Sequence, residues 1–127
     1  MSDRLYIVDD EADHARMLAD YATELGWAVK VEQDPARFLN YDHHDSGVLV
    51  LDLIMPDMDG IEIIQGIAAA SLPLSLILVS GFDYRILESA RMLAQAHGIT
   101  VHGCLEKPID FRMFKALLGK AGGTANP

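Results

Sequence analysis

Two runs in the middle of the chain are apolar at nearly every position, and they constrain the fold more than any other feature. Val48–Asp52 reads Val-Leu-Val-Leu-Asp, and Leu74–Ser80 reads Leu-Ser-Leu-Ile-Leu-Val-Ser. A strand with one face in water alternates apolar and polar residues, whereas a strand covered on both faces is apolar almost throughout. Because parallel sheets are the ones covered by helices on both faces, these runs predict the central strands of an α/β protein.

Strand and helix patterns alternate five times along the chain. Further strands are predicted at Leu5–Asp9, Trp27–Val31 and Ile99–Leu105. Helical patterns are predicted over residues 18–25 before Gly26, over residues 35–39 after an Asp34 N-cap, after Gly60 with Ile61, Ile64, Ile67 and Ala68 facing inward, over residues 86–94 before Gly98, and after Asp110 with Phe111, Phe114 and Leu118. Helices between successive strands give right-handed parallel crossovers. We therefore expect a doubly wound, three-layer α/β fold with a five-stranded parallel sheet, in the order 2-1-3-4-5 common for such folds.

Length and charge narrow the classes of function. The 127 residues fit one domain, predicted over residues 1–120, and the loose composition of residues 121–127 indicates a flexible tail or the start of a linker. The net charge is -9, and residues 1–60 hold 14 acidic and 4 basic side chains. Direct nucleic-acid contact is disfavoured because phosphate contacts need a basic face. An acidic half suits a divalent cation or a basic partner.

The remaining composition points to the cytoplasm. A single cysteine, Cys104, excludes an intrachain disulfide, and within a predicted strand it is interpreted as a small buried hydrophobic residue rather than a reactive thiol. The first residues lack the order of a signal peptide, and no apolar run approaches the ~20 residues that span a bilayer. We expect a cytoplasmic protein without membrane contact.

Charged side chains follow three of the predicted strands. Asp9 and Asp10 end the first strand, Asp52 ends the third, and Lys107 follows the fifth. In the order 2-1-3-4-5, strands one and three are neighbours, so the three carboxylates converge at the carboxyl edge of the sheet, where such folds bind ligands. Close carboxylates repel one another and need a cation, and three hard oxygen ligands suit Mg²⁺. Ser80 and Lys107 complete a predicted metal-and-phosphate site.

Four motifs together resemble the receiver domain of two-component response regulators. They are Val8-Asp9-Asp10-Glu11, the stretch Asp52-Leu-Ile-Met-Pro-Asp-Met-Asp-Gly60, Ser80-Gly81 and Lys107-Pro108, and the resemblance spans roughly residues 4–119. It implies the flavodoxin-like (βα)5 form of the fold and a conformational switch that takes phosphate from a histidine kinase or a phosphotransfer protein. The domain would catalyse only its own phosphorylation and dephosphorylation.

The resemblance also implies roles for individual residues. Asp52 would be the phosphoacceptor, Asp10 would bind Mg²⁺ directly, Asp9 would act largely through water, and the backbone carbonyl of Ile54 would be a further ligand. The other implied positions are Ser80 as the switch hydroxyl, Gly81 as the small residue beside the phosphoryl group, Lys107 as the phosphoryl-binding cation, and Pro108 after a cis peptide bond.

The chain departs from the family pattern near its end and around the acceptor. Cys104 stands where receivers usually carry a switch Tyr or Phe, which puts that form of coupling in doubt. His102 is expected on the same strand face, either substituting in part for the aromatic or, as favoured, as a half-buried strand histidine. Ile54 and Phe82 lie two residues past Asp52 and Ser80, where bulky groups could slow dephosphorylation or simply pack together.

Other polar and sulfur-containing residues are assigned no part in the site. His43-His44 is interpreted as a solvated loop, Met55 and Met58 as loop packing, Asp57 and Asp59 as turn and cap residues, and His14 and His97 as surface residues of helices.

Two other functions stay open beside the phosphorylation switch. A Mg²⁺-dependent phosphatase of similar fold would need a second carboxylate two residues after its nucleophile, and Ile54 occupies that position. A phosphorylation-independent interaction module is favoured by the missing aromatic and disfavoured by the intact acids, Ser80 and Lys107.

The sequence predicts only loosely which output domain or partner such a receiver would control. Residues 98–108 are similar to receivers joined to cyclic-di-GMP phosphodiesterase (EAL) domains. A stand-alone receiver, one attached to a DNA-binding domain, and a phosphorylation-dependent homodimer are open as well.

Overall fold

The computed structural model describes residues 4–42, 45–56, 58–81 and 84–122, with Tyr84 described by its backbone alone. Five strands and five helices alternate along these residues. They are β1 (Arg4–Val8), α1 (Ala12–Glu24), β2 (Ala28–Glu32), α2 (Pro35–Leu39), β3 (Gly47–Asp52), α3 (Gly60–Ala69), β4 (Leu74–Ser80), α4 (Tyr84–Ala96), β5 (Val101–Glu106) and α5 (Phe111–Gly122).

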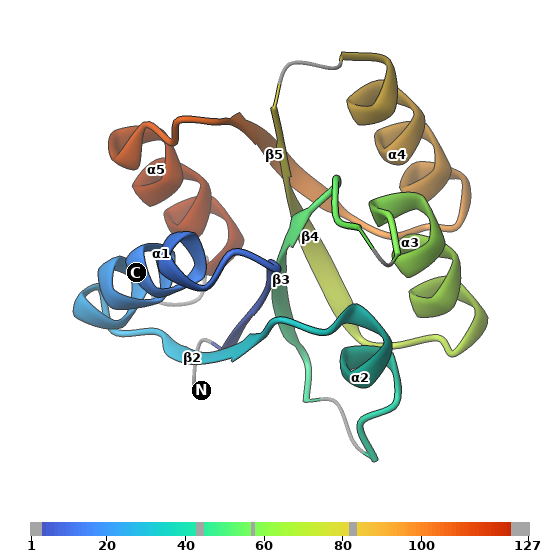
Figure 1. Ribbon diagram of the computed structural model, residues 1–127, viewed down its shortest axis with the longest axis horizontal. Coiled ribbons are helices and arrows are strands. Elements are labelled where there is room, and N and C mark those ends of the chain that lie inside the picture. The colour runs from blue at the N-terminus through green and yellow to red at the C-terminus, as the bar shows by residue number, and fades with distance from the viewer. Residues whose placement is uncertain (1–3, 43–44, 57, 82–83, 123–127) are drawn as a thin grey trace.

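All strand pairs are parallel, and the sheet order is β2-β1-β3-β4-β5. Helices α1 and α5 cover one face of the sheet, and α2, α3 and α4 cover the other (Figure 1). The predicted three-layer, doubly wound α/β fold is therefore confirmed. Since β1 and β3 are neighbours, the residues that follow them meet at one edge of the sheet.

Each face of the sheet has its own buried core. On the α2–α3–α4 side, Leu49, Leu51, Leu76 and Leu78 pack against the helices. On the α1–α5 side, apolar side chains of β1, β3, β4 and β5 pack against residues that include Leu18 and Phe114. The two central strands are apolar at nearly every position because both of their faces are covered.

One predicted helix face is wrong by a small rotation. Ile63, Ile64 and Ile67 of α3 are fully buried, whereas Ile61 and Ala68 are only partly buried. The helix begins at Gly60, which packs directly on Leu53, and this contact sets which side chains face the sheet. Helix α1 begins at Ala12, six residues before the predicted range 18–25, and no side chain caps its first turn. The bounds predicted for the other helices and strands lie within two residues of the observed ones, and α2 and β4 have their predicted bounds.

None of the described helices is both long enough and apolar enough to cross a bilayer.

Candidate functional site

The carboxyl edge of the sheet gathers the predicted site residues. Asp9 directly follows β1, Asp52 and Ser80 are the last residues of β3 and β4, and Lys107 directly follows β5. Asp9, Asp52 and Ser80 are the three buried polar or charged residues of the described part of the chain, each 2–3% exposed. Parallel strands end at a common edge, so residues that lie up to 98 positions apart in sequence share one site.

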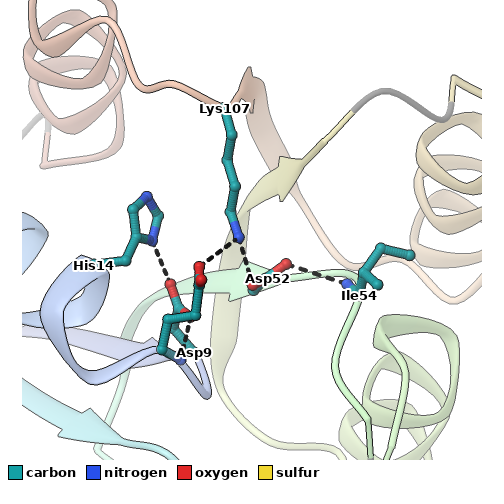
Figure 2. A network of polar contacts seen from close by, with 6 residues as sticks. Asp9, His14, Asp52, Ile54 and Lys107 are labelled. Atoms are coloured by element: carbon teal, nitrogen blue, oxygen red, sulfur yellow. Dashed lines mark hydrogen bonds and ion pairs between the residues drawn. The ribbon is translucent and has the colours of Figure 1, made fainter.

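The Asp52 carboxylate is held at both oxygens. Its Oδ1 accepts a hydrogen bond from the Ile54 backbone N–H at 3.1 Å, and its Oδ2 accepts one from Lys107 Nζ at 3.0 Å (Figure 2). Burial raises the pKa of the Asp52 carboxyl above its ordinary value, although the hydrogen bonds from Lys107 and Ile54 oppose that rise. The negative charge of Asp9 raises this pKa further.

Lys107 reaches the site from the end of β5, whereas Asp9 and Asp52 lie at the ends of β1 and β3. Besides Asp52, its ammonium contacts Glu11 Oε1 at 3.3 Å, and its backbone N–H donates to the Ser80 carbonyl at 2.9 Å. Burial lowers the pKa of Lys107, but its hydrogen bond to Asp52 and the surrounding negative charges outweigh this effect, so the pKa is raised overall. The Lys107–Pro108 peptide bond is cis, as the resemblance implied.

Three carboxylates come close enough to share a cation. Oxygen atoms of Asp9, Asp10 and Asp52 all lie within 4.8 Å of one another, with Asp9 and Asp52 buried and Asp10 exposed. Close carboxylates in a poorly solvated place repel each other, and oxygen ligands with an open, solvated side fit Mg²⁺. The donor set therefore fits the predicted ion.

The sequence profile of the response regulator receiver domain matches residues 5–118. The chain belongs to the response regulator receiver domain family.

Two proteins and two solved structures illustrate this relationship. The receiver domain is 37% identical over 78 residues to the transcriptional regulatory protein FixJ of Rhizobium meliloti (strain 1021), an alignment that covers 61% of this chain and 38% of FixJ. It is 30% identical over 117 residues to the sensor histidine kinase RcsC of Escherichia coli (strain K12), covering 90% of this chain and 12% of RcsC. The chain thus spans well under two thirds of either relative.

Solved structures agree over the whole receiver domain. A response regulator from Colwellia psychrerythraea has a TM-score of 0.85 and 35% identity, with 98% of this chain and 99% of that chain covered. The structure of FixJ-N has a TM-score of 0.83 and 28% identity, with 100% of this chain and 98% of that chain covered. This chain is a signalling domain of two-component systems, and the phosphorylation switch is favoured over an interaction module.

His14 was not predicted to belong to the site, and its assignment as a surface residue is wrong. Its side chain is 15% exposed, and Nδ1 lies 2.5 Å from Asp9 Oδ2. The histidine stands in the first turn of α1, and this turn begins only three residues after Asp9. The short β1–α1 connection was the available signal, because it leaves the first turn beside the end of the strand.

His102 does not take the place of the missing aromatic of the receiver domain. A register shift in the β4–β5 pairing lies between Leu76 and Ile77, opposite His102. The ring bonds to Ser75 Oγ at 2.8 Å, on the face that β4 turns towards α1 and α5. Cys104 instead packs against the core on the α2–α3–α4 side. The expectation that both side chains share a face is wrong, because a β-bulge shifts the alternation; the half-buried histidine is confirmed.

The other residues singled out from the sequence have varied places. Cys104 is half-buried, and burial raises the pKa of its thiol. Met55 is buried in the core, Asp59 caps α3 in a capping box with Glu62, and Ile54 is 53% exposed. A Cβ added to Gly81 would meet nothing within 4 Å. The predictions for His43, His44, Asp57 and Phe82 fall outside the described residues.

Proposed function

We propose that Asp52 accepts a phosphoryl group from the phosphohistidine of a sensor histidine kinase or a phosphotransfer protein. The main support is the environment of Asp52, a buried carboxylate at a strand end that lies beside two further carboxylates and one ammonium group. In the transfer, an Asp52 oxygen bonds to phosphorus while the phosphorus–nitrogen bond breaks, and the electron pair of that bond stays on the departing imidazole.

The site residues divide the work around this step. Asp9, Asp10, Asp52 and the Ile54 backbone carbonyl would hold Mg²⁺, which when bound neutralises charge on the phosphoryl oxygens. Lys107 would pair with a phosphoryl oxygen, and the Ser80 hydroxyl would donate a hydrogen bond to another. Gly81 would leave room beside the phosphoryl group, and Pro108 would help to direct Lys107 inward.

Access to Asp52 requires a local rearrangement. Its side chain is 3% exposed, and Lys107 occupies its Oδ2. The Lys107 ammonium also contacts Glu11, an exposed side chain that can hold the ammonium on the outer side of the site. A movement of Lys107 from Asp52 to the incoming phosphoryl group would open the carboxylate and keep the ammonium paired.

The whole protein around this domain is part of the same proposal. The match over residues 5–118 supports a receiver unit at residues 1–120, followed by a tail or linker at 121–127. A relative is named a transcriptional regulatory protein and another a sensor histidine kinase, so receivers of this kind occur in proteins with different outputs. An attached output domain, of the DNA-binding or EAL type, and a phosphorylation-dependent homodimer fit such an arrangement.

Intact-mass spectrometry after incubation with acetyl phosphate and Mg²⁺ tests the proposal. The wild-type domain should gain the mass of one phosphoryl group, Asp52→Asn should gain none, and Asp42→Asn, a change at an exposed acid away from the site, should behave as wild type. A wild-type protein that gains no phosphate and shows no change with beryllofluoride would overturn the proposal and leave the interaction module.

A further inference from the structure

The Asp9 carboxylate is held from both sides by the chain that follows it. Its Oδ1 accepts a hydrogen bond from the Glu11 backbone N–H at 2.9 Å, and His14 Nδ1 lies 2.5 Å from its Oδ2 (Figure 2). Asp9 itself is 2% exposed. With one bond to each oxygen, both the position and the rotation of this carboxylate are fixed.

The contact between Asp9 and His14 also determines which nitrogen of the His14 ring carries a proton. An ionised carboxylate accepts hydrogen bonds and donates none, so Nδ1 must carry the proton of the shared bond. The other ring nitrogen, Nε2, is buried and has no hydrogen-bond partner among the described residues. A buried polar atom without a partner carries a free-energy cost that an apolar side chain of similar size would avoid. The favourable interaction of this histidine is therefore concentrated in its bond to Asp9.

We propose that His14 is a positioning residue that fixes the Asp9 carboxylate for binding of the divalent cation. This inference rests on the proposed function, since it assumes that Asp9 belongs to the cation site. The oxygens of Asp9, Asp10 and Asp52 lie within 4.8 Å of one another in the arrangement that His14 helps to hold. Groups that orient a metal-binding carboxylate reduce the ordering cost that the ion would otherwise meet on binding.

The identity of the contacting nitrogen gives the inference a sharp test. An asparagine side chain places its amide nitrogen near the position of Nδ1, whereas a glutamine side chain extends to the position of Nε2. His14→Asn should therefore keep the bond to Asp9, and His14→Gln should lose it. His14→Leu fills similar space and has no donor. His97→Leu is a matched control, because His97 is exposed and lies at the opposite edge of the sheet, next to the start of β5.

The measurement is the dissociation constant for Mg²⁺, determined by isothermal titration calorimetry on the unphosphorylated domain. We expect His14→Leu and His14→Gln to bind Mg²⁺ about tenfold more weakly than wild type. His14→Asn should recover most of the affinity, and His97→Leu should match wild type. Urea unfolding without metal shows whether each variant is folded, and if His14→Leu is not, the Asn and Gln variants still decide the question.

Two results would overturn the inference. One is a His14→Leu or His14→Gln domain that binds Mg²⁺ as tightly as wild type or more tightly. The other is equal weakness of His14→Asn and His14→Gln, which would indicate a general packing role. Either result would leave the proposed function intact if wild type binds Mg²⁺ and its Asp52 gains phosphate. A wild-type domain that does neither would overturn both.

Discussion

Single residues at the sheet edge carry their charges in places where charge is costly. Asp9 and Asp52 are almost completely buried, and Lys107 is the single ammonium group in contact with Asp52 among the described residues. A buried ion pair of this kind seldom adds net stability, because desolvation of the two charges offsets their attraction. The pKa values of Asp52 and Lys107 are displaced by burial and by one another, which is characteristic of functional sites.

His102 should make the stability of the metal-free domain depend on pH. Burial lowers the pKa of His102, and the charge of Lys120 lowers it further. The unfolded chain therefore binds a proton that the folded chain does not, and stability falls as the pH drops from about 6.5, the ordinary pKa of histidine, towards the folded value. In urea unfolding with a chelator present, wild type should lose stability more steeply than His102→Gln, by up to about 1.4 kcal/mol per pH unit.

The glutamine variant is a matched comparison because it can still hydrogen-bond Ser75 but cannot take up a proton. Parallel curves for wild type and His102→Gln below pH ~6.5 would show that His102 does not contribute this dependence.

The place of a site residue could be predicted where nearby sequence determines it, and could not where the three-dimensional course of the chain determines it. Asp9, Asp52 and Lys107 could be predicted because each follows a recognisable strand, and strand ends meet at one edge. His14 could not, since its helical pattern alone suggests a surface position and only the three-dimensional course of the β1–α1 turn puts it beside Asp9. The face of His102 depends on a β-bulge, and no residue pattern in β5 marks one unambiguously.

At the scale of elements, the connection from β3 to α3 is held by main-chain contacts. The Leu53 N–H donates to the Val79 carbonyl, and the Gly60 N–H donates to the Leu53 carbonyl, both at 3.0 Å. Asp59 and Glu62 form a capping box at the start of α3. This connection also positions the Ile54 N–H that bonds to Asp52. The connection that leads into α3 therefore helps to hold the Asp52 carboxylate in place.

Gly60→Ala should destabilise the domain by about 1–3 kcal/mol, the usual cost of overpacking. A Cβ at Gly60 would lie 2.9 Å from Leu53 Cα and 2.3 Å from its Cδ2, so the backbone itself would have to shift. Gly119→Ala is the control, because a Cβ there meets nothing within 4 Å, and alanine in a helix should add up to about 1 kcal/mol. Urea unfolding of both variants measures the difference, and equal stability of Gly60→Ala and wild type would contradict the packing argument.

Whole elements were predicted well wherever local signals agree with the tertiary structure. The bounds of α2 follow from Asp34 and Pro35, whose side chain and ring conformation start a helix, and those of β4 follow from its continuous apolar run. The inward face of α3 was wrong because four isoleucines lie close together in this helix and the pattern alone allows more than one face. The contact of Gly60 with Leu53 decides between them.

At the scale of the whole molecule, the fold gathers acidic side chains from the first half of the sequence at one edge of the sheet. Asp9, Asp10, Glu11 and Asp52 all belong to residues 1–60, and the neighbouring positions of β1 and β3 place them at one edge. Lys107 is the basic group that the second half contributes there. Folding therefore concentrates negative charge that the unfolded chain keeps apart.

Mg²⁺ should stabilise the folded domain, because the site exists only when β1 and β3 are paired. At a hundred times its dissociation constant, the ion should raise the free energy of unfolding by about 2.7 kcal/mol. Asp10→Asn should lose most of this increment, and the exposed control Asp42→Asn should keep it. Urea unfolding with Mg²⁺ or with a chelator gives both values. The same increment in Asp10→Asn as in wild type would exclude Asp10 from the ion site.

The hydrogen bond from the Lys107 N–H to the Ser80 carbonyl, 2.9 Å long, connects the end of β4 to the residue just beyond β5. Neither backbone segment can therefore shift at this point unless the other shifts with it or the hydrogen bond breaks. A displacement of Ser80 would thus be passed to β5, the edge strand beside β4, and on to the start of α5. Such a change would therefore reach the surface of the domain at β5 and α5 rather than in the middle of the sheet.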